Sequence, residues 1–337
     1  MKILLDGMGG DYAPASVVEG AVEALPFINH EIVILGDEDQ IGKELDKYKG
    51  NLGRISVVHT TEIITNEDAP VKAVRTKTDS SIVKGMNMLK NGEGDLFISA
   101  GSTGALMAAG LFILHRITGI DRPAIATIYP ILSGGFSLLV DAGANAECRA
   151  SNLLEFACMG SIYMESVMDV PNPSIGLVNI GTEAQKGTAT IKEAYGLLEA
   201  SKLHFIGNVE AREIPVGVCD VIVADGFVGN VILKLTEGLA LNILSTVKKK
   251  ITSGMVAKMG ALILKRKFME LKEEFDYSEY GGAPLLGIRG PVIKMHGSSN
   301  AKAVKNSLIK AVPFMEENVV GRIESAIENL KEINIAD

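Results

Sequence analysis

The chain has 337 residues, of which 47% are hydrophobic and 22% charged, a profile typical of a soluble globular protein with one large or two medium domains. Its net charge of −8 argues against general nucleic-acid binding, and the absence of tryptophan argues against a stacking platform for sugars or single-stranded nucleic acid. The three cysteines have no metal-ligand or redox spacing, so we expect buried thiols in a reducing cytosol. Only three consecutive apolar residues precede Asp6, too few for a signal peptide, so we expect no secretory signal.

Short apolar strands alternate with helical segments along most of the chain. Helices are expected around Ser16–Leu25 and Glu38–Tyr48. The expected strands are Lys2–Asp6, Glu31–Leu35, Ile55–Val58, Asp95–Ser99, Ala124–Ile128, Phe136–Asp141, Ser174–Ile180, His204–Ile206 and Val221–Ala224. This alternation predicts an α/β fold with a mainly parallel sheet covered on both faces. Functional groups in such sheets gather at the carboxyl ends of strands, where most polar and glycine-rich motifs of this chain lie.

The stretch Asp95–Leu114 is a strand that turns through small residues into an apolar helical run. Backbone N–H groups at such a helix start are unpaired, and glycine allows an anion to approach them. The turn has neither a Walker lysine nor the dinucleotide-binding glycine pattern. It is either an anion site or the cap of a buried core helix. The candidate anion-binding residues are Gly101, Ser102, Thr103 and Gly104.

The segment Ala69–Ser81 is basic and rich in hydroxyl groups. It is interpreted either as a solvated helix entry, with Asp79 or Ser80 as the cap, or as a rim that meets an acidic partner.

Polar side chains follow the later strands. Asn145 either binds a ligand or closes a turn, and Lys186 is either an active-site cation or a surface lysine. Thr182 and Glu183 are expected to open a helix beside Lys186. If the strand ends converge, these side chains are neighbours of the anion turn, together with two polar residues that follow Val221–Ala224, namely Asp225 and Asn230.

Two glycine-rich motifs lie late in the chain. Tyr280–Gly287 is expected to form a mobile loop. His296 stands close to Ser298, but no Gly-x-Ser-x-Gly elbow supports a hydrolase, and a helix cap at Ser299 or Asn300 is the simpler interpretation. No repeat or long linker divides the chain, so we predict a single catalytic domain over 1–337.

The sheet pattern pauses over 231–275, where we predict a protruding helical pair broken at Ser253-Gly254. Lys248–Lys267 holds seven basic residues and no acid; removing those seven positive charges from the net charge of −8 leaves −15 for the rest. Packing on its own core or dimerisation leaves this excess of cations unexplained, whereas contact with an anionic membrane surface accounts for it. The apolar stripe of the second arm comprises Met255, Val256, Met259, Leu262 and Ile263.

Taken together and in order, the motifs resemble bacterial phosphate acyltransferase, the acyl-[acyl-carrier-protein]:phosphate acyltransferase family of phospholipid synthesis. Essentially the whole chain carries the resemblance. The motifs are MKILLDGMGGDYAP, SAGSTGAL, VDAGAN, LVNIGTEAQKG, FIGNVEAREI, DVIVADGFVGN and EYGGAPLLG followed by HGSS. Two positions depart from the family pattern: Ser102 stands where asparagine is expected, and Ala142 where a larger apolar residue is usual.

The resemblance implies transfer of a long-chain fatty acyl group from acyl-carrier protein to inorganic phosphate. It also implies a three-layer α/β/α sandwich like those of phosphotransacetylase and the isocitrate/isopropylmalate dehydrogenases, a homodimer, and no metal or organic cofactor. The acyl phosphate then passes to a membrane glycerol-3-phosphate acyltransferase. A cytoplasmic enzyme bound peripherally to the membrane fits this sequence of steps.

For that chemistry we expect the Gly101–Gly104 backbone, with Ser102 and Thr103, to hold phosphate, while Lys186 and Asn230 face the thioester carbonyl oxygen. Three further polar residues, Asp225, Asn145 and His296, are expected to orient them, and Ser298 of the HGSS motif joins the substrate-binding set. The acidic carrier protein would meet a basic patch at the site mouth, drawn from Arg75, Lys77 or Lys265–Lys267.

Three alternatives remain. A coenzyme-A phosphotransacetylase of the same fold would use a small acyl group and would not need a membrane-seeking tip. A nicotinamide-dependent decarboxylating dehydrogenase is disfavoured because the sequence has no dense carboxylate cluster for a metal. A non-catalytic membrane scaffold that gathers lipid enzymes belongs to a different functional class.

Overall fold

The computed structural model describes residues 1–254, 264–267 and 281–335. Within these ranges one 11-stranded sheet has the order β3-β2-β1-β4-β11-β10-β5-β6-β9-β7-β8. The strands are β1 (Lys2–Asp6), β2 (Glu31–Gly36), β3 (Ile55–His59), β4 (Leu96–Ser99), β5 (Ala124–Pro130), β6 (Phe136–Val140), β7 (Ile175–Asn179), β8 (Phe205–Glu210), β9 (Val221–Val223), β10 (Ala283–Leu286) and β11 (Val292–Lys294).

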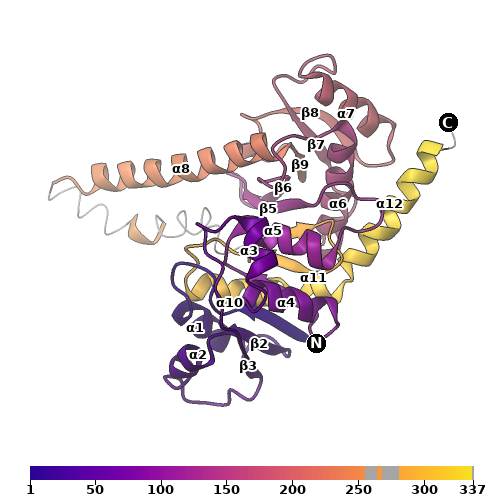
Figure 1. Cartoon of the computed structure of the whole chain (residues 1–337). Coiled ribbons are helices and arrows are strands. Elements are labelled where there is room, and N and C mark those ends of the chain that lie inside the picture. The colour runs from indigo at the N-terminus through magenta and orange to yellow at the C-terminus, as the bar shows by residue number, and fades with distance from the viewer. Residues whose placement is uncertain (255–263, 268–280, 336–337) are drawn as a thin grey trace.

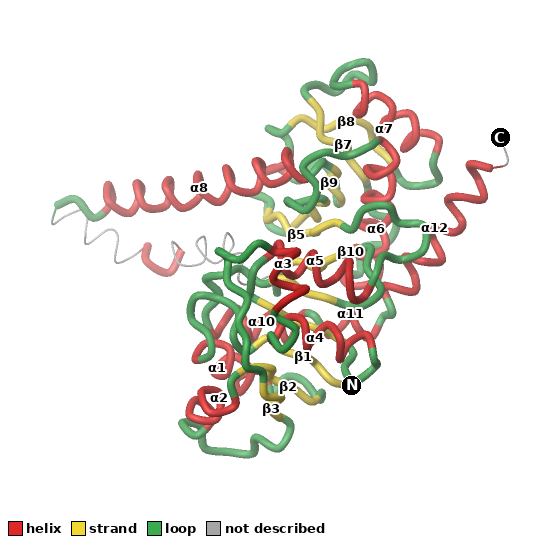
Figure 2. The backbone as a smooth tube through the Cα atoms, viewed as in Figure 1, coloured by secondary structure: helices red, strands yellow, loops and turns green. Residues whose placement is uncertain are grey.

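Helices cover both faces of this sheet (Figures 1 and 2). They are α1 (Ala15–Ala24), α2 (Glu38–Leu45), α3 (Pro70–Thr76), α4 (Ser81–Lys90), α5 (Thr103–Ala109), η1 (Gly110–Leu114), α6 (Ala150–Val167), α7 (Ala189–Ala200), η2 (Ile214–Val216), α8 (Gly226–Ile251), α10 (Ala301–Lys310), α11 (Val312–Glu316) and α12 (Val319–Ile335).

Alternation along the strands sends side chains into two separate cores. In β1, Ile3 and Leu5 pack into the core that includes α1, α6 and α10. Leu4, between them, packs into the opposite core with α4 and α5. The predicted three-layer α/β/α fold is therefore confirmed.

All nine predicted strands are present, with ends that differ from the prediction by up to four residues, but two central strands were not predicted. The prediction of a loop over Tyr280–Gly287 is wrong for Ala283–Leu286, which forms β10; Tyr280 lies outside the described residues. These strands have three or four residues and show no alternation, so local sequence gives little signal. Pairing on both sides in the middle of the sheet stabilises them instead.

The central strands reverse the direction of the sheet. β10 is antiparallel to β11 and β5, and β5 is antiparallel to β6. Strands β4 and β6 therefore run in opposite directions, although each is parallel to its outer neighbour. Their carboxyl ends therefore point toward opposite edges of the sheet.

The prediction that Thr182 and Glu183 open a helix is wrong. Residues 181–188 form a loop, and α7 begins at Ala189, where the Thr188 hydroxyl accepts a hydrogen bond from the Ile191 amide at 3.3 Å. Gly187 has φ +92°, which a right-handed helix does not accommodate. Elsewhere side-chain caps occur at predicted positions: Ser80 begins α4 and Asn300 begins α10.

Helix α8 projects from the body of the molecule (Figure 1). In its most apolar 18-residue window the mean hydropathy is 1.4, yet only 6% of that window is buried. A single helix of this kind is weak evidence for a membrane span. The helix ends at Ile251, and Gly254 has φ +93°, so the predicted break is confirmed. The predicted apolar stripe of the second arm lies outside the described residues.

Candidate active site

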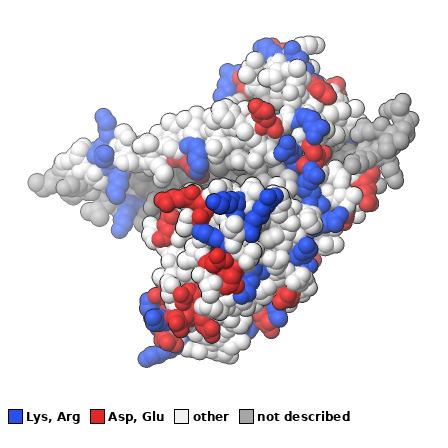
Figure 3. Space-filling model, in the orientation of Figure 1, with Lys and Arg blue, Asp and Glu red and all other residues white. Residues whose placement is uncertain are grey.

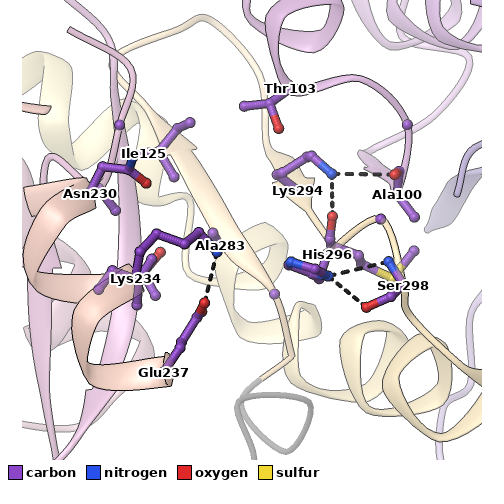
Figure 4. Close-up of a pocket in the computed structure, with 18 of the residues that line it drawn as sticks. Ala100, Thr103, Ile125, Asn230, Lys234, Glu237, Ala283, Lys294, His296 and Ser298 are labelled. Atoms are coloured by element: carbon purple, nitrogen blue, oxygen red, sulfur yellow. Dashed lines mark hydrogen bonds and ion pairs between the residues drawn. The ribbon is translucent and has the colours of Figure 1, made fainter. Parts of the chain in front are cut away.

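A cavity of about 520 Å³ lies between α8 and the turns that follow β4 and β11 (Figure 4). Three residues of β5, Ile125, Thr127 and Ile128, also line it. The α8 wall carries four side chains at helical spacing, namely Asn230, Leu233, Lys234 and Glu237. The cavity therefore has a polar side, formed by the two turns, and a wall with apolar patches.

Five residues predicted from the sequence line this cavity. They come from three separate parts of the chain: the turn after β4, the second turn of α8, and the segment after β11. Figure 4 shows Thr103, His296 and Ser298 on one side and Asn230 on the other. The five residues are Gly101, Thr103, Asn230, His296 and Ser298.

The turn after β4 is partly committed to its own structure. Ser102 is buried, and its hydroxyl accepts a hydrogen bond from the Ala105 amide at 3.5 Å, as a helix cap does. The Gly101 amide donates to the Ser99 hydroxyl at 2.9 Å. A side chain at Gly104 would meet Pro70 of α3. In the described part of the chain no acceptor is found for the amides of Ser102, Thr103 and Gly104. Thr103 lines the cavity with an exposed side chain, so it can offer both its hydroxyl and its amide to a ligand.

The turn after β6 also borders the cavity, at Ala142 and Gly143, and a fully buried carboxylate supports each of the two turns, after β4 and after β6. Asp6 accepts hydrogen bonds from the Ser99 hydroxyl at 2.6 Å and from the Met8 amide at 3.1 Å. On the other side of the cavity, Asp141 accepts from the amides of Ala144 and Asn145 at 2.9 and 2.7 Å. Burial raises the pKa of Asp141, and these amide donors oppose that change. The two carboxylates hold the backbone that borders the cavity.

Gly143 lies in the turn after β6, and its backbone conformation explains why this turn contains glycine. Its φ is +135°, and a Cβ there would lie 3.5 Å from the Cβ of Asn230. Glycine is therefore favoured here by the backbone conformation, whereas a Cβ at this distance from Asn230 would make only an ordinary contact.

Lys294 is a cavity residue that sequence reasoning missed. It is the last residue of β11, and its Nζ donates to the Ala100 carbonyl at 3.3 Å and to the Met295 carbonyl (Figure 4). Burial lowers the pKa of Lys294 to about 8, while Asp6 and Asp11 act in the opposite direction. One signal was available: Lys294 is a single charge within the apolar run Val292–Met295, directly before the His296 motif.

The match to known proteins covers nearly the whole chain. Residues 1–322 match the family model described as fatty acid synthesis protein. The chain belongs to this family. It is 53% identical over 330 residues to a protein named phosphate acyltransferase from Alkaliphilus oremlandii, covering 98% of each chain. It is 48% identical over 334 residues to another of that name from Clostridioides difficile, covering 99% of this chain and 98% of the relative. The family predicted from the motifs is confirmed.

Solved structures share the fold of this fatty acid synthesis family member. A phosphotransacetylase from Streptococcus pyogenes superposes with a TM-score of 0.63 at 18% identity, covering 94% of each chain. A branched-chain phosphotransacylase from Enterococcus faecalis gives 0.56 at 14% identity, covering 93% of this chain and 98% of the other. At these identities the likeness shows the fold alone.

Five predicted residues lie outside the cavity lining, namely Ser102, Gly104, Asn145, Lys186 and Asp225. Asn145 is buried and donates its side-chain amide to the Pro123 carbonyl and to Asp141, at 2.7 and 2.9 Å. Asp225 caps α8 by accepting from the Val228 amide at 2.8 Å, one turn before Asn230. Both hold cavity residues in place. Their predicted parts in substrate handling remain predictions.

Lys186 also lies outside the lining. Its Nζ is 2.9 Å from a Glu183 carboxylate oxygen, and its side chain is 49% exposed. It follows β7, which lies next to the edge strand β8. For the predicted catalytic role, the Lys186 side chain would have to leave Glu183 and reach a substrate in the cavity, because the structure holds it outside the cavity lining.

His296 and Ser298 form a local pair at the cavity. The Nδ1 atom of His296 is 2.8 Å from the Ser298 hydroxyl oxygen, and burial lowers the pKa of His296. On the facing wall, Lys234 pairs with Glu237 at 2.8 Å. In the described residues no cluster of three or more His, Cys, Asp or Glu is arranged to hold a metal ion.

Of the two rim candidates Arg75 and Lys77, Arg75 is exposed and Lys77 is held by an ion pair. Lys77 donates to Asp68 at 2.6 Å and to the Ile63 carbonyl at 2.8 Å. Arg75 instead lies over the ring of Phe112, 5.1 Å from its centroid. Arg75 is therefore the better candidate for contact with an acidic partner. Of Lys265–Lys267, the structure describes only a short helical segment, with exposed side chains.

Proposed function

We propose that this chain transfers an acyl group from a thioester to inorganic phosphate and releases an acyl phosphate. The observation that carries the proposal is the near-full-length identity of about one half to proteins named phosphate acyltransferase. The cavity suits the chemistry, because it combines a lysine and a hydroxyl for an anion with an apolar wall for an acyl group.

The reaction needs little acid or base catalysis from the protein. Hydrogen phosphate is already an anionic nucleophile near neutral pH, so no strong general base is needed. A phosphate oxygen forms the new bond to the thioester carbon, the carbon–sulfur bond breaks, and the thiolate takes up the phosphate proton. Orientation of the two substrates and donors for the developing oxyanion supply the catalysis.

Asn230 is the described side chain best placed to meet the carbonyl oxygen. It faces the cavity from α8, opposite Thr103 and Lys294 (Figure 4), and lies close to Gly143. The thioester would then lie along α8 and β5, with its acyl chain near Leu233, Ile125 and Ile128. Asp225 supports this arrangement as the cap of the same helix.

For the acyl donor we favour a long-chain acyl-carrier protein. The carrier is acidic, and Arg75 offers an exposed cation on α3, which packs against α5 at the cavity. Four-residue spacing also places exposed apolar side chains along α8, including Val231, Leu235 and Leu239. A second copy of the chain is proposed to cover this surface, forming a homodimer.

The basic, apolar run Lys248–Lys267 supports a further proposal of reversible contact with an anionic membrane surface, from the cytoplasmic side. Three lysines close α8 at its outer end, and Figure 3 shows an otherwise largely uncharged helix surface. Such contact would let a membrane glycerol-3-phosphate acyltransferase receive the acyl phosphate directly.

The test is an assay of free carrier thiol with palmitoyl-carrier protein, run with and without inorganic phosphate. We expect thiol release only with phosphate. The coenzyme-A phosphotransacetylase alternative, supported by the shared fold, predicts faster turnover of acetyl-coenzyme A than of palmitoyl-carrier protein. A non-catalytic scaffold predicts no phosphate-dependent release from either donor.

A further inference from the structure

The Nζ atom of Lys294 has more N–H donors than it has hydrogen-bond acceptors among the described residues. A lysine ammonium carries three N–H donors. Two of them point to backbone carbonyls, those of Ala100 and Met295. Because Lys294 also lines the cavity, the third donor is left for whatever occupies it. Burying an ammonium is costly, so a lysine kept in this position with no carboxylate hydrogen bonded to it among the described residues suggests a ligand of opposite charge.

The surroundings hold the ammonium in a fixed place. The Ala100 carbonyl belongs to the turn after β4. In this turn the Gly101 amide donates to the Ser99 hydroxyl at 2.9 Å, and that hydroxyl donates to Asp6 at 2.6 Å. A Cβ at Gly9 would lie 2.3 Å from the Asp6 carboxylate and 2.6 Å from the Gly101 nitrogen. Four segments therefore meet tightly behind Lys294: the end of β1, the turn after it, the turn after β4, and β11.

We propose that Lys294 is the cation that holds the phosphate acceptor, its third N–H and the Thr103 hydroxyl each meeting a phosphate oxygen. Asp6 and Ser99 are positioning residues, since they act through the turn that carries Ala100. This inference rests on the proposed function and deepens it, by naming the residue that binds the acceptor.

The ammonium keeps its proton through the transfer. Phosphate forms the carbon–oxygen bond, the carbon–sulfur bond breaks, and the proton that the thiolate gains comes from hydrogen phosphate. Lys294 therefore acts by charge and orientation, and its binding of phosphate opposes the loss of its own proton.

Two substitutions separate charge from hydrogen bonding. Lys294→Gln removes the charge but keeps a donor for the carbonyls, and Lys294→Met removes both. Both variants lose the charge-assisted hydrogen bond to phosphate, which is worth about 1.5–3 kcal/mol. We therefore expect the KM for phosphate to rise by about 10- to 100-fold in each. The KM for the acyl donor should stay within about threefold of the wild-type value, because the thioester lies against the other wall.

Lys84→Met is the matched control. The Lys84 Nζ also donates to a backbone carbonyl, that of His59 at 2.8 Å, and pairs with Asp79, but it does not line the cavity. This variant should keep the wild-type KM for phosphate. A KM for phosphate within about threefold of wild type in a folded Lys294→Gln variant would overturn the assignment.

Calorimetric titration with inorganic phosphate alone distinguishes this inference from the proposed function, since it needs no turnover. Tighter phosphate binding by the wild type than by Lys294→Gln supports the assignment even if no acyl phosphate forms. Equal binding, or no binding to the wild type, contradicts it. Absence of acyl phosphate from the wild-type assay counts against the proposed function instead.

The pH dependence of the wild type keeps the inference testable if both variants fail to fold. Asp6 on β1 and Asp11 in the following turn act on the pKa of Lys294. The other titratable groups that face it across or within the cavity are His296 after β11 and the α8 pair Lys234 and Glu237. Lys294 loses its charge as the pH rises past about 8, so phosphate binding should weaken there. Phosphate affinity that stays constant to about pH 9.5 would overturn the inference.

Discussion

Asn230 faces the cavity from the second turn of α8, against Gly143. If its side-chain amide donates to the developing oxyanion, Asn230→Ala should lower kcat by about 100- to 1000-fold, the usual cost of losing one such donor. Steady-state kinetics with saturating phosphate measures this. A loss of less than about threefold would remove Asn230 from the mechanism.

Lys186 is predicted from the sequence to face the thioester carbonyl oxygen, but it does not line the cavity. If Lys186 reaches the carbonyl oxygen during turnover, Lys186→Ala should lower kcat/KM by about 100-fold or more. Glu183→Ala is the matched control, because it removes only the partner carboxylate at 2.9 Å. If the pair is merely a surface ion pair, both variants will behave as the wild type does.

At the scale of residues, candidate site residues can be identified from the sequence where they closely follow a strand that is itself predictable. Thr103 and Asn230 were found because β4 and β9 are apolar runs bounded by small residues. Lys294 was missed because β11 has only three residues and depends on pairing with β4, which lies far earlier in the chain, as well as with the short strand β10. Helix caps such as Ser102 and Asp225 look like ligand donors until their amide partners are known.

At the scale of elements, α8 links the cavity to an exposed apolar surface. Leu235 and Leu239 are more than half exposed, on a helix whose first turns line the cavity. If a second copy covers them, Leu235→Glu/Leu239→Glu should give a monomer in analytical ultracentrifugation at micromolar concentration. Val216→Glu, at an equally exposed apolar residue of η2, should leave the dimer intact. A dimer that survives the double substitution places the interface elsewhere.

Element prediction succeeded where hydrophobic period and length agree. β1 and β2 alternate with helices of eight to ten residues, and their apolar runs could be assigned directly. It failed over 181–188, where Thr182 and Glu183 suggested a helix start but glycines on either side favoured a loop. The reversal of direction at β10 and β5 depends on pairing between strands more than 150 residues apart, which local patterns do not encode.

At the scale of the whole molecule, charge is distributed unevenly. The run Lys248–Lys267 is strongly basic while the remainder carries a net charge of −15 after its removal from the total of −8. We therefore expect the protein to float with anionic liposomes and to do so less as salt concentration rises. Met259→Glu/Leu262→Glu, at positions outside the described residues, should abolish flotation. Flotation of this variant at the wild-type level would contradict a membrane role for the tip.

The most direct test of the whole account is a crystal structure with inorganic phosphate bound. We predict an anion in the cavity between α8 and the turn after β4, within hydrogen-bonding distance of the Thr103 hydroxyl and Lys294 Nζ. Phosphate bound beside Lys186, with the cavity empty at the same phosphate concentration, would contradict it.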